Sequence, residues 1–404
     1  MTGHLSSILQ ALLEPQERYD RLYQKCLHSV GRKVCDLAYA NSYDGPNLTV
    51  TNAIKEVLES PRSLQLQYTP YGGCTITRRL IAERLSQTHG EPFCWHDVIL
   101  TPGAMAGLNV IFRAVKTDGR GEVVILTPCW MDYPLYLVHL GLKPVPVPLR
   151  RDTFRFDFDL IEHAITPATR AIVFSQPANP TAVVYSDNEI AQLAGLLQKW
   201  SVGQSEPPII ISDECHRDVV YPPNSFTSAL RHYASTVIVY SFGKSLLMQG
   251  QRIGYVAISP RMGARESLQR LLERNCRMMG FCTPTALMQV AIRKLLTHSP
   301  NLELLAARCD RIVTALQSYG YSLVPPQGTF FIYVRSPDPD DFAFTEKLAK
   351  KGVLVLPGSL FHDCGYIRIS VTASDEMIDR ALPVFQFAMS DKGMLSARTG
   401  HPEV

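Results

Sequence analysis

A lysine and an arginine that lie close together are the first candidates for chemistry in this sequence. Lys244 follows Thr236–Tyr240, a run of β-branched and aromatic residues typical of a buried strand. Arg252 comes directly before a second apolar run, Ile253–Ile258, and Ser241 adds a hydroxyl just ahead of the lysine. A deprotonated lysine forms Schiff bases with carbonyl compounds, and arginine binds phosphate oxygens through two parallel hydrogen bonds. These residue types favour a cofactor with a carbonyl and a phosphate. A surface lysine and a solvated arginine are an equally open interpretation, because short motifs match by chance.

The same segment carries a family resemblance. Ser241-x-x-Lys244, followed by Arg252-x-Gly-Tyr, is similar to the lysine segment of fold-type I pyridoxal-phosphate enzymes of the class I/II aminotransferase superfamily. The resemblance implies that Lys244 holds pyridoxal 5'-phosphate as a Schiff base and then moves the α-proton of the substrate. It also implies that Ser241 and Arg252 bind the cofactor phosphate.

Composition narrows the class of protein. A chain of 404 residues exceeds what one hydrophobic core usually supports, so two domains are expected. The hydrophobic share of 46%, the charged share of 19% and the net charge of +3 are typical of a globular enzyme and argue against binding to nucleic acid or to a membrane surface. The ten cysteines form no C-x-x-C pair, so neither a zinc site nor a disulfide framework is predicted. Without a signal peptide or a long apolar run, we expect a cytoplasmic protein.

The order of the apolar runs predicts the fold. Short apolar runs alternate with helical patterns from about residue 98 to 258, which predicts a largely parallel sheet with helices on both faces. After about residue 260, long helices and a few strands predict a smaller α+β domain. With the resemblance, this is the α/β fold of a fold-type I transferase, in which helices sandwich a sheet of the seven-stranded type. The expected divisions are an N-terminal segment that joins the small domain (1–45), a large cofactor-binding domain (46–280), a small C-terminal domain (281–390) and a loose tail (391–404).

A turn between a strand and a helix is a candidate phosphate site. Val98–Leu100 runs into Thr101-Pro-Gly-Ala-Met105, and a helical pattern follows. The free N–H groups at a helix N-terminus favour an anion. Because Met105 has no side-chain donor, the contacts from Gly103, Ala104 and Met105 are expected to come mainly from the main chain. The alternative is an ordinary strand–helix turn.

Three more candidates stand at strand ends. Asp213 ends the apolar run Ile209–Ser212, where the resemblance implies a carboxylate that faces the cofactor's ring nitrogen. Asn179 lies in Gln176-Pro-Ala-Asn-Pro-Thr181, which is similar to the family's N-P-T-G signature. This similarity implies that the Asn179 amide lies near the ring's 3-oxygen and the substrate. Trp130 follows another run in a P-x-W-x-x-Y pattern, which implies an aromatic that stacks on the ring and borders the substrate. The alternatives are a strand cap, a turn asparagine and a core tryptophan.

Substrate and partner contacts are implied elsewhere in the chain. Arg368 lies within the apolar strand Tyr366–Val371, and a charge there needs a partner. The resemblance implies the α-carboxylate of an amino-acid substrate, and an internal ion pair is the alternative. Tyr68 matches the family's Y-x-P-x-x-G turn, whose tyrosine reaches the cofactor phosphate of the neighbouring subunit, so a homodimer is expected. Tyr43 is expected to contact the substrate.

Three departures from the family pattern bear on the reaction. His216 stands where the family has a tyrosine that donates to the ring's 3-oxygen, and its charge is expected to depend on pH. Ala182 replaces the glycine of N-P-T-G, and the loop 40–46 aligns poorly with the family's glycine loop. A set of loop and aromatic residues is expected to line a pocket for a basic or polar side chain: Tyr43, Asp44, Tyr71, Glu214 and Phe330.

Two reactions therefore compete. The first hypothesis is an aminotransferase. The second is a lyase or cyclase that uses the same cofactor for β- or γ-elimination, similar to capreomycidine and enduracididine synthases, which act on hydroxylated arginine. The loop 40–46 and His216 motivate the second hypothesis.

Overall fold

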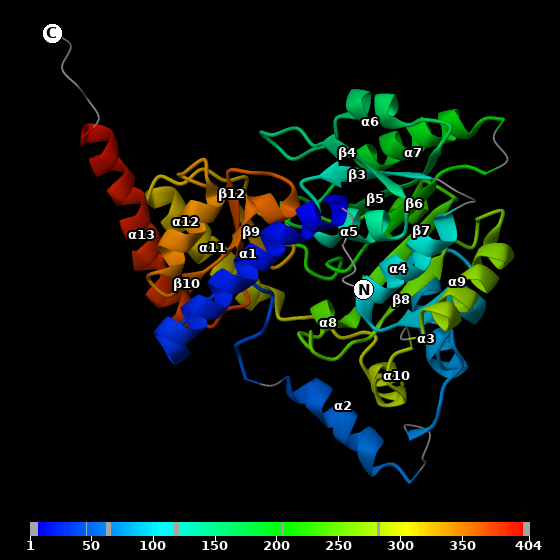
Figure 1. Ribbon diagram of the computed structural model, residues 1–404. Helices are drawn as coiled ribbons and strands as arrows, with labels where there is room; N and C mark the ends of the chain where they lie inside the picture. Colours follow the sequence, from blue (N-terminus) through cyan, green and yellow to red (C-terminus); the bar gives the residue numbers. More distant parts are fainter. Residues whose placement is uncertain are drawn as a thin grey trace, which may run out of the picture.

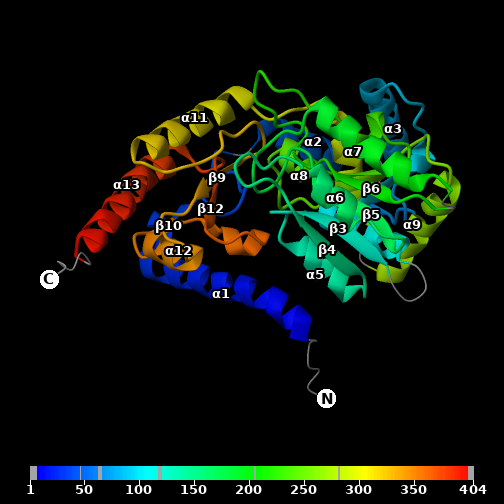
Figure 2. The same ribbon diagram turned by 90° about the horizontal axis from the view of Figure 1, so that it is seen from above.

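The computed structural model describes residues 7–45, 47–61, 66–116, 121–203, 206–280 and 283–398. Two bodies lie side by side, a larger one built on a wide sheet and a smaller one that carries the C-terminal helices (Figures 1 and 2). Within these described ranges, no helix is long and apolar enough to cross a membrane.

The larger body is built on a seven-stranded sheet. Its strand order is β2-β8-β7-β6-β5-β3-β4, and β8 is antiparallel to both of its neighbours while the other pairs are parallel. The predicted mostly parallel sheet of seven-stranded type is therefore present. Its strands are β2 (Val98–Thr101), β3 (Glu122–Thr127), β4 (Lys143–Pro148), β5 (Thr169–Ser175), β6 (Ile209–Asp213), β7 (Thr236–Ser241) and β8 (Gly254–Ile258).

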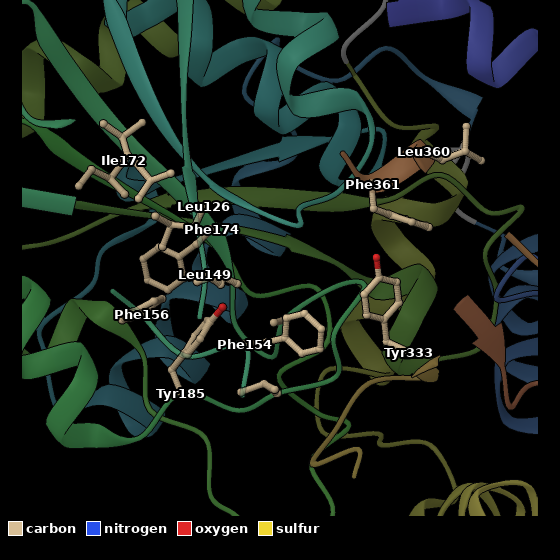
Figure 3. Packing of buried hydrophobic residues seen from close by; sticks show 14 of the residues in the cluster. Leu126, Leu149, Phe154, Phe156, Ile172, Phe174, Tyr185, Tyr333, Leu360 and Phe361 are labelled. Atoms are coloured by element: carbon tan, nitrogen blue, oxygen red, sulfur yellow. The ribbon is translucent and has the colours of Figure 1, made fainter. Parts of the chain in front are cut away.

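Helices cover both faces of this sheet because its central strands are apolar on both sides. On one face, alternate strand residues pack against α4 (Gly103–Val115), α5 (Asp132–His139) and α9 (Arg265–Met279). On the other face, the intervening residues pack against α6 (Phe158–Ala164), α7 (Asp187–Ser201) and α3 (Thr75–His89). Figure 3 shows part of this second core, where rings from the loop after β4 meet rings of the smaller body.

The smaller body contains two small sheets. β9 (Phe331–Arg335), β12 (Tyr366–Ser370) and β11 (Leu356–Pro357) form an antiparallel sheet in the order β11-β12-β9. β1 (Cys35–Asp36) pairs in parallel with β10 (Val353–Leu354), so the N-terminal segment packs with the C-terminal part of the chain. The helices here are α11 (Leu302–Ser318), α12 (Asp341–Ala349) and α13 (Asp375–Arg398).

Two features of the structure bear on the expected domain limits. α10 (Ala286–Ala291) packs against α2 (Leu48–Glu59), and its Met288 belongs to the core formed with α3 of the larger body. We therefore propose that the smaller domain begins near α11 rather than at 281, a position that lies outside the described residues. α13 continues to Arg398, past the start of the expected loose tail at 391. α1 (Ser7–Val30) packs against both α5 and α12 and so connects the two bodies (Figure 2).

Candidate active site

The carboxyl ends of the parallel strands meet at one edge of the large sheet, and ligands in open α/β sheets bind at this edge. Each predicted cofactor residue except Tyr68 lies on or shortly after the end of one of these strands or, for Arg252, just before antiparallel β8. The sheet therefore brings together residues that are far apart in sequence.

Lys244 lies in α8 (Phe242–Ser245), a single turn that follows β7. Ser241 caps this turn by accepting a hydrogen bond from the N–H of Gly243. Burial lowers the pKa of Lys244 to about 8, and the positive charges of Arg368 and Arg252 act in the same direction. More of this amine is therefore an uncharged nucleophile near neutral pH than in an ordinary lysine.

Asp213 ends β6 and is buried beside the lysine. Its Oδ2 accepts a hydrogen bond of 2.7 Å from the hydroxyl of Tyr133, and its Oδ1 accepts one of 3.2 Å from the N–H of Cys215. Burial raises the pKa of Asp213 above its usual value, while these hydrogen bonds and Lys244 pull it down. These hydrogen bonds fix the orientation of the carboxyl group, which can pair with a cation or accept a hydrogen bond from an N–H group.

Trp130 packs beside the tyrosine that hydrogen-bonds Asp213. Its ring packs edge-on against Tyr133, with the ring centroids 5.5 Å apart, and against Tyr136 at 5.7 Å. Trp130 is half-buried, so part of its ring remains available to a flat ligand.

Gly103 and Arg252 form the candidate phosphate site. Gly103 begins α4 with φ of +78°, and a Cβ at this position would lie 2.7 Å from the Arg252 guanidinium. The positive φ favours glycine here, and the guanidinium occupies the space that a Cβ would take. The free N–H groups of the first turn of α4, which includes Ala104 and Met105, thus lie next to an arginine, as an anion site requires.

Arg368 lies in β12, and its guanidinium is buried over the rings of Phe331 and Phe361, at 3.8 and 4.7 Å. Nη1 donates to Oδ1 of Asn179 over 2.9 Å, and Nη2 donates to the carbonyl of Ala38 over 3.0 Å. Burial lowers the pKa of Arg368 to about 9. Among the described residues no carboxylate pairs with it, so the internal ion pair that was the alternative is not formed.

Ala182, which replaces the glycine of the N-P-T-G signature, lies where the two bodies meet. Ala182 adopts φ of +61°, a left-handed conformation that favours glycine, and it is fully buried. Its carbonyl accepts hydrogen bonds from the N–H groups of Gln327 and Gly328. Ala182 therefore acts in the connection between the two bodies.

His216 is buried against Phe330 and Phe331, whose ring centroids lie 5.3 and 5.4 Å from its own. Burial lowers its pKa well below the usual value, and the charges of Lys244 and Arg368 add to this effect. The imidazole is neutral at physiological pH, so the expected pH-dependent charge is wrong for the neutral range. Within the described part of the chain, Nδ1 has no hydrogen-bond partner.

The expected pocket for a basic side chain is not assembled. Arg308 binds both carboxylate oxygens of Asp44 over 2.8 Å, and the hydroxyl of Tyr43 donates to Asp36 over 2.7 Å. Glu214 is fully buried and accepts hydrogen bonds from Ser212, Ser228 and Arg217.

Two aromatic candidates also lie apart from Lys244. The ring of Tyr71 contacts Arg277 of α9, and Tyr68 is fully exposed in the single chain. Phe330 is buried against His216, so of the five expected pocket residues it alone contacts the candidate site.

Sequence reasoning missed several contacts. Tyr133, which donates a hydrogen bond to Asp213, stands in the P-x-W-x-x-Y pattern, and this pattern is the one sequence signal that could have pointed to the contact. Phe331, Phe361 and the carbonyl of Ala38 surround Arg368, but nothing in their local sequence distinguishes them from core residues.

The geometry agrees with the comparison with known proteins. Residues 32–385 match the family model described as aminotransferase class I and II. A probable aspartate/prephenate aminotransferase of Aquifex aeolicus is 29% identical, over 82% of this chain and 86% of that protein, and an aspartate/prephenate aminotransferase of Thermus thermophilus is 28% identical, over 79% and 82%.

Solved structures agree as well. An amino transferase of Eubacterium rectale superposes with a TM-score of 0.85 at 30% identity, over 96% of this chain and 97% of that one. An aspartate aminotransferase of Thermotoga maritima superposes with a TM-score of 0.85 at 25% identity, over 96% and 100%. The expected fold-type I architecture is confirmed, and the chain belongs to the class I and II aminotransferase family.

Proposed function

We propose that this aminotransferase uses pyridoxal 5'-phosphate, held by Lys244, to transfer the amino group of an amino-acid substrate. The residues present fit such a group. Gly103 and Arg252 leave a cradle that a Cβ would fill, Asp213 offers a fixed carboxylate, and Lys244 offers an amine with a lowered pKa of about 8. When bound, the cofactor supplies an electron sink for the substrate's α-carbon.

The observation that carries this proposal is the convergence on one edge of the sheet of a lysine with a lowered pKa, a buried carboxylate and an arginine beside a helix N-terminus. Each taken alone is common at strand ends. Together they match a ligand with a carbonyl, a basic ring nitrogen and a phosphate. The amine would react with the carbonyl, the carboxylate would pair with the protonated nitrogen, and the arginine would bind the phosphate.

The remaining residues receive roles from the same geometry. Asp213 would hold a proton on the ring nitrogen, and Trp130 would cover the ring and exclude water. Ser241, Arg252 and the first turn of α4 (Gly103, Ala104 and Met105) would bind the phosphate. Asn179 and His216 would face the 3-oxygen side.

The substrate contacts follow from Arg368. Its guanidinium has a fixed orientation and no carboxylate partner among the described side chains, so the substrate's α-carboxylate would supply the missing charge. Asn179 and Trp130 would border the substrate. Lys244 would accept the α-proton and return it at the neighbouring carbon. Tyr43 is held by Asp36 and would border the entrance.

We also propose a homodimer, in which Tyr68 completes the partner's phosphate site. Large apolar side chains are exposed near this tyrosine and the phosphate turn, and a second copy would bury them: Leu66, Tyr68, Tyr71, Ile76, Met105 and Met278. Cys26, Cys35, Cys129, Cys215 and Cys309 are buried free thiols, which supports the proposed cytoplasmic location.

Reductive trapping tests the cofactor assignment. The protein is loaded with pyridoxal 5'-phosphate, reduced with borohydride and digested, and the modified peptide is identified by mass spectrometry. We expect the pyridoxyl mass on Lys244, its loss in Lys244→Ala, and its retention in Lys199→Ala, which changes an exposed lysine of α7. Modification at another lysine, or the same visible absorption in Lys244→Ala, would refute the assignment.

Single-turnover product analysis tests the reaction. The loaded enzyme is mixed with aspartate, glutamate, aromatic amino acids or arginine derivatives, without an oxo-acid acceptor. Transamination predicts one oxo acid per site and a stop after one turnover. Continued turnover with release of an eliminated or cyclised amino acid would favour the lyase or cyclase. The loop that motivated that alternative is held by Arg308 and Asp36, so it offers no free carboxylate for a guanidinium substrate.

A further inference from the structure

A large cavity lies between the two bodies, on the far side of an aromatic wall from the candidate active site. Its volume is about 890 Å³, which is within the range of small-molecule sites. One side is the loop between β4 and α6, which contributes Arg151, Asp152 and Phe154. The other side comes from β9, β12 and the segment before β9, and includes Arg335 and Tyr366.

The strand register relates this cavity to the candidate active site. Arg335 pairs with Tyr366, and Tyr333 pairs with Arg368, across the β9–β12 ladder. Paired residues and residues two apart on a strand share one face of a sheet. All four side chains therefore project from the same face, with Arg335 and Arg368 at opposite ends and the two tyrosines between them.

The tyrosines close the space between the two arginines. The rings of Tyr333 and Tyr366 stack with an interplanar angle of 8° and a centroid distance of 4.8 Å. Phe154 packs edge-on against both, at 5.5 and 5.6 Å. Figure 3 shows Phe154 and Tyr333 facing one another, with Phe361 beyond the tyrosine hydroxyl. The cavity is thus a compartment separate from the one that contains Arg368.

The lining of the cavity has an apolar floor and a charged rim. Leu323, Val324 and Tyr366 are half-buried in the floor, whereas Arg151 and Arg335 are exposed at the rim. This is the usual anatomy of a ligand site, in which apolar groups bury the body of the ligand and a few polar groups orient it.

The charges at the rim favour an anion. Arg335 forms no ion pair with any side chain in the described ranges, and Arg151 lies 3.6 Å from Asp363. The guanidinium groups of Arg335 and Arg151 both act to lower the pKa of Tyr366, so both lie close enough to influence its hydroxyl, although Asp152 and Asp363 act in the opposite direction. An unpaired guanidinium next to an apolar floor matches a carboxylate on a ring.

We propose that this cavity is a second binding site, which takes a small organic anion with an aromatic body. Arg335 binds the anionic group, Arg151 closes over it from the larger body, and Tyr366, Leu323 and Val324 bury the ring. A ligand held in this way contacts both bodies of the chain at a distance from the candidate active site.

The test is calorimetric titration of the cofactor-loaded protein with 2-naphthoate, while the visible absorption of the cofactor reports any binding at the active site. We expect a binding event that leaves this absorption unchanged. Arg335→Met should weaken it by at least about tenfold, because it removes the charge-assisted contact. Arg21→Met, which removes an exposed arginine of α1 that does not line this cavity, should bind as the wild type does.

A second variant and two further probes complete the test. Ser322→Trp fills the cavity from its rim and should abolish the event, with thermal unfolding as the check that the variant is folded. 2-Naphthylmethanol, which lacks the charge, and inorganic phosphate, which lacks the ring, should both bind at least about tenfold more weakly. The proposal is overturned if no spectrally silent binding occurs, if Arg335→Met binds as the wild type does, or if phosphate binds as tightly as naphthoate.

Discussion

Arg368 donates a hydrogen bond from Nη1 to Oδ1 of Asn179 over 2.9 Å, and so connects a strand of the smaller sheet to the loop after β5 of the larger one. The same guanidinium is bonded to the carbonyl of Ala38 and covered by two phenylalanine rings. Its position therefore depends on three separate parts of the chain, and its remaining N–H groups are held in one direction.

Arg368→Lys should raise the KM for the amino-acid substrate by about 100-fold, with a smaller effect on kcat. A lysine carries the charge but cannot bind Asn179, Ala38 and a carboxylate at once in fixed geometry. Steady-state kinetics measure the change, and Arg21→Lys, which changes an exposed arginine of α1, is the control. An unchanged KM would contradict the assignment of Arg368 to the substrate carboxylate.

Tyr133→Phe should destabilise the cofactor-free protein by about 1–2 kcal/mol, because it leaves the buried Asp213 carboxyl group without its 2.7 Å hydrogen bond. It should also weaken cofactor binding, since the pKa of Asp213 would rise further above its usual value. Urea unfolding and cofactor dissociation measure the two effects. Tyr136→Phe, which changes a half-buried tyrosine on the same helix, should have the smaller effect, and equal effects would contradict the role of Tyr133.

Lys244 should react as an amine with a pKa of about 8 in the cofactor-free protein. Burial and the nearby arginines disfavour its charged form, so its carbamylation by cyanate should rise with pH and reach half its maximal rate near pH 8. Quantitative peptide mass spectrometry measures the rate, with Nα-acetyl-lysine as the reference at about 10.4. A midpoint equal to that of the reference would show that the lysine is not perturbed.

His216 should contribute a loss of stability as the pH falls below about 6.5. Its folded-state pKa lies well below the usual value, so the unfolded chain binds a proton there that the folded chain does not bind. The cations Lys244 and Arg368 and the rings of Phe330 and Phe331 face it.

Urea unfolding of the cofactor-free protein measures this effect. We expect His216→Asn to lose about 1 kcal/mol less than the wild type between about pH 6.5 and pH 5.5. His163→Asn, which changes an exposed histidine of α6, should follow the wild type. Parallel stability curves for the wild type and His216→Asn would show that His216 is protonated in the folded protein.

Arg308→Met should destabilise the protein by about 2 kcal/mol and raise the KM for the substrate. Arg308 is buried and binds Asp44 and Asp375, but both carboxylates are partly exposed, so solvent screening reduces the loss below that of a fully buried pair. The change releases the loop that carries Tyr43. Arg21→Met, which changes an exposed arginine of α1, should have little effect in urea unfolding and kinetics, and a similar loss in both variants would contradict the role of Arg308.

Local sequence was sufficient for residues that follow strands. The strand ends at Asp213 and Ser241 and the glycine turn at Gly103 could be predicted because a parallel sheet places such positions at one edge. Pattern and resemblance together therefore predicted the α/β fold, the family and the group of residues around Lys244. They did not predict the length of α13 or the packing of α10 with the larger body, since both depend on which apolar faces meet.

Tertiary structure alone decided what each charged group contacts. The sequence shows Asp44, Glu214 and Arg368 as three charges of unknown partnership, and folding pairs the first two with arginines while leaving the third without a carboxylate among the described residues. It also decided that His216 is neutral, because burial rather than residue type sets its pKa. Packing decides which residues distant in the chain come into contact, and local sequence patterns do not predict these contacts. The sequence by itself thus determined the fold and the chemistry available, whereas the tertiary structure determined which groups are free to perform it.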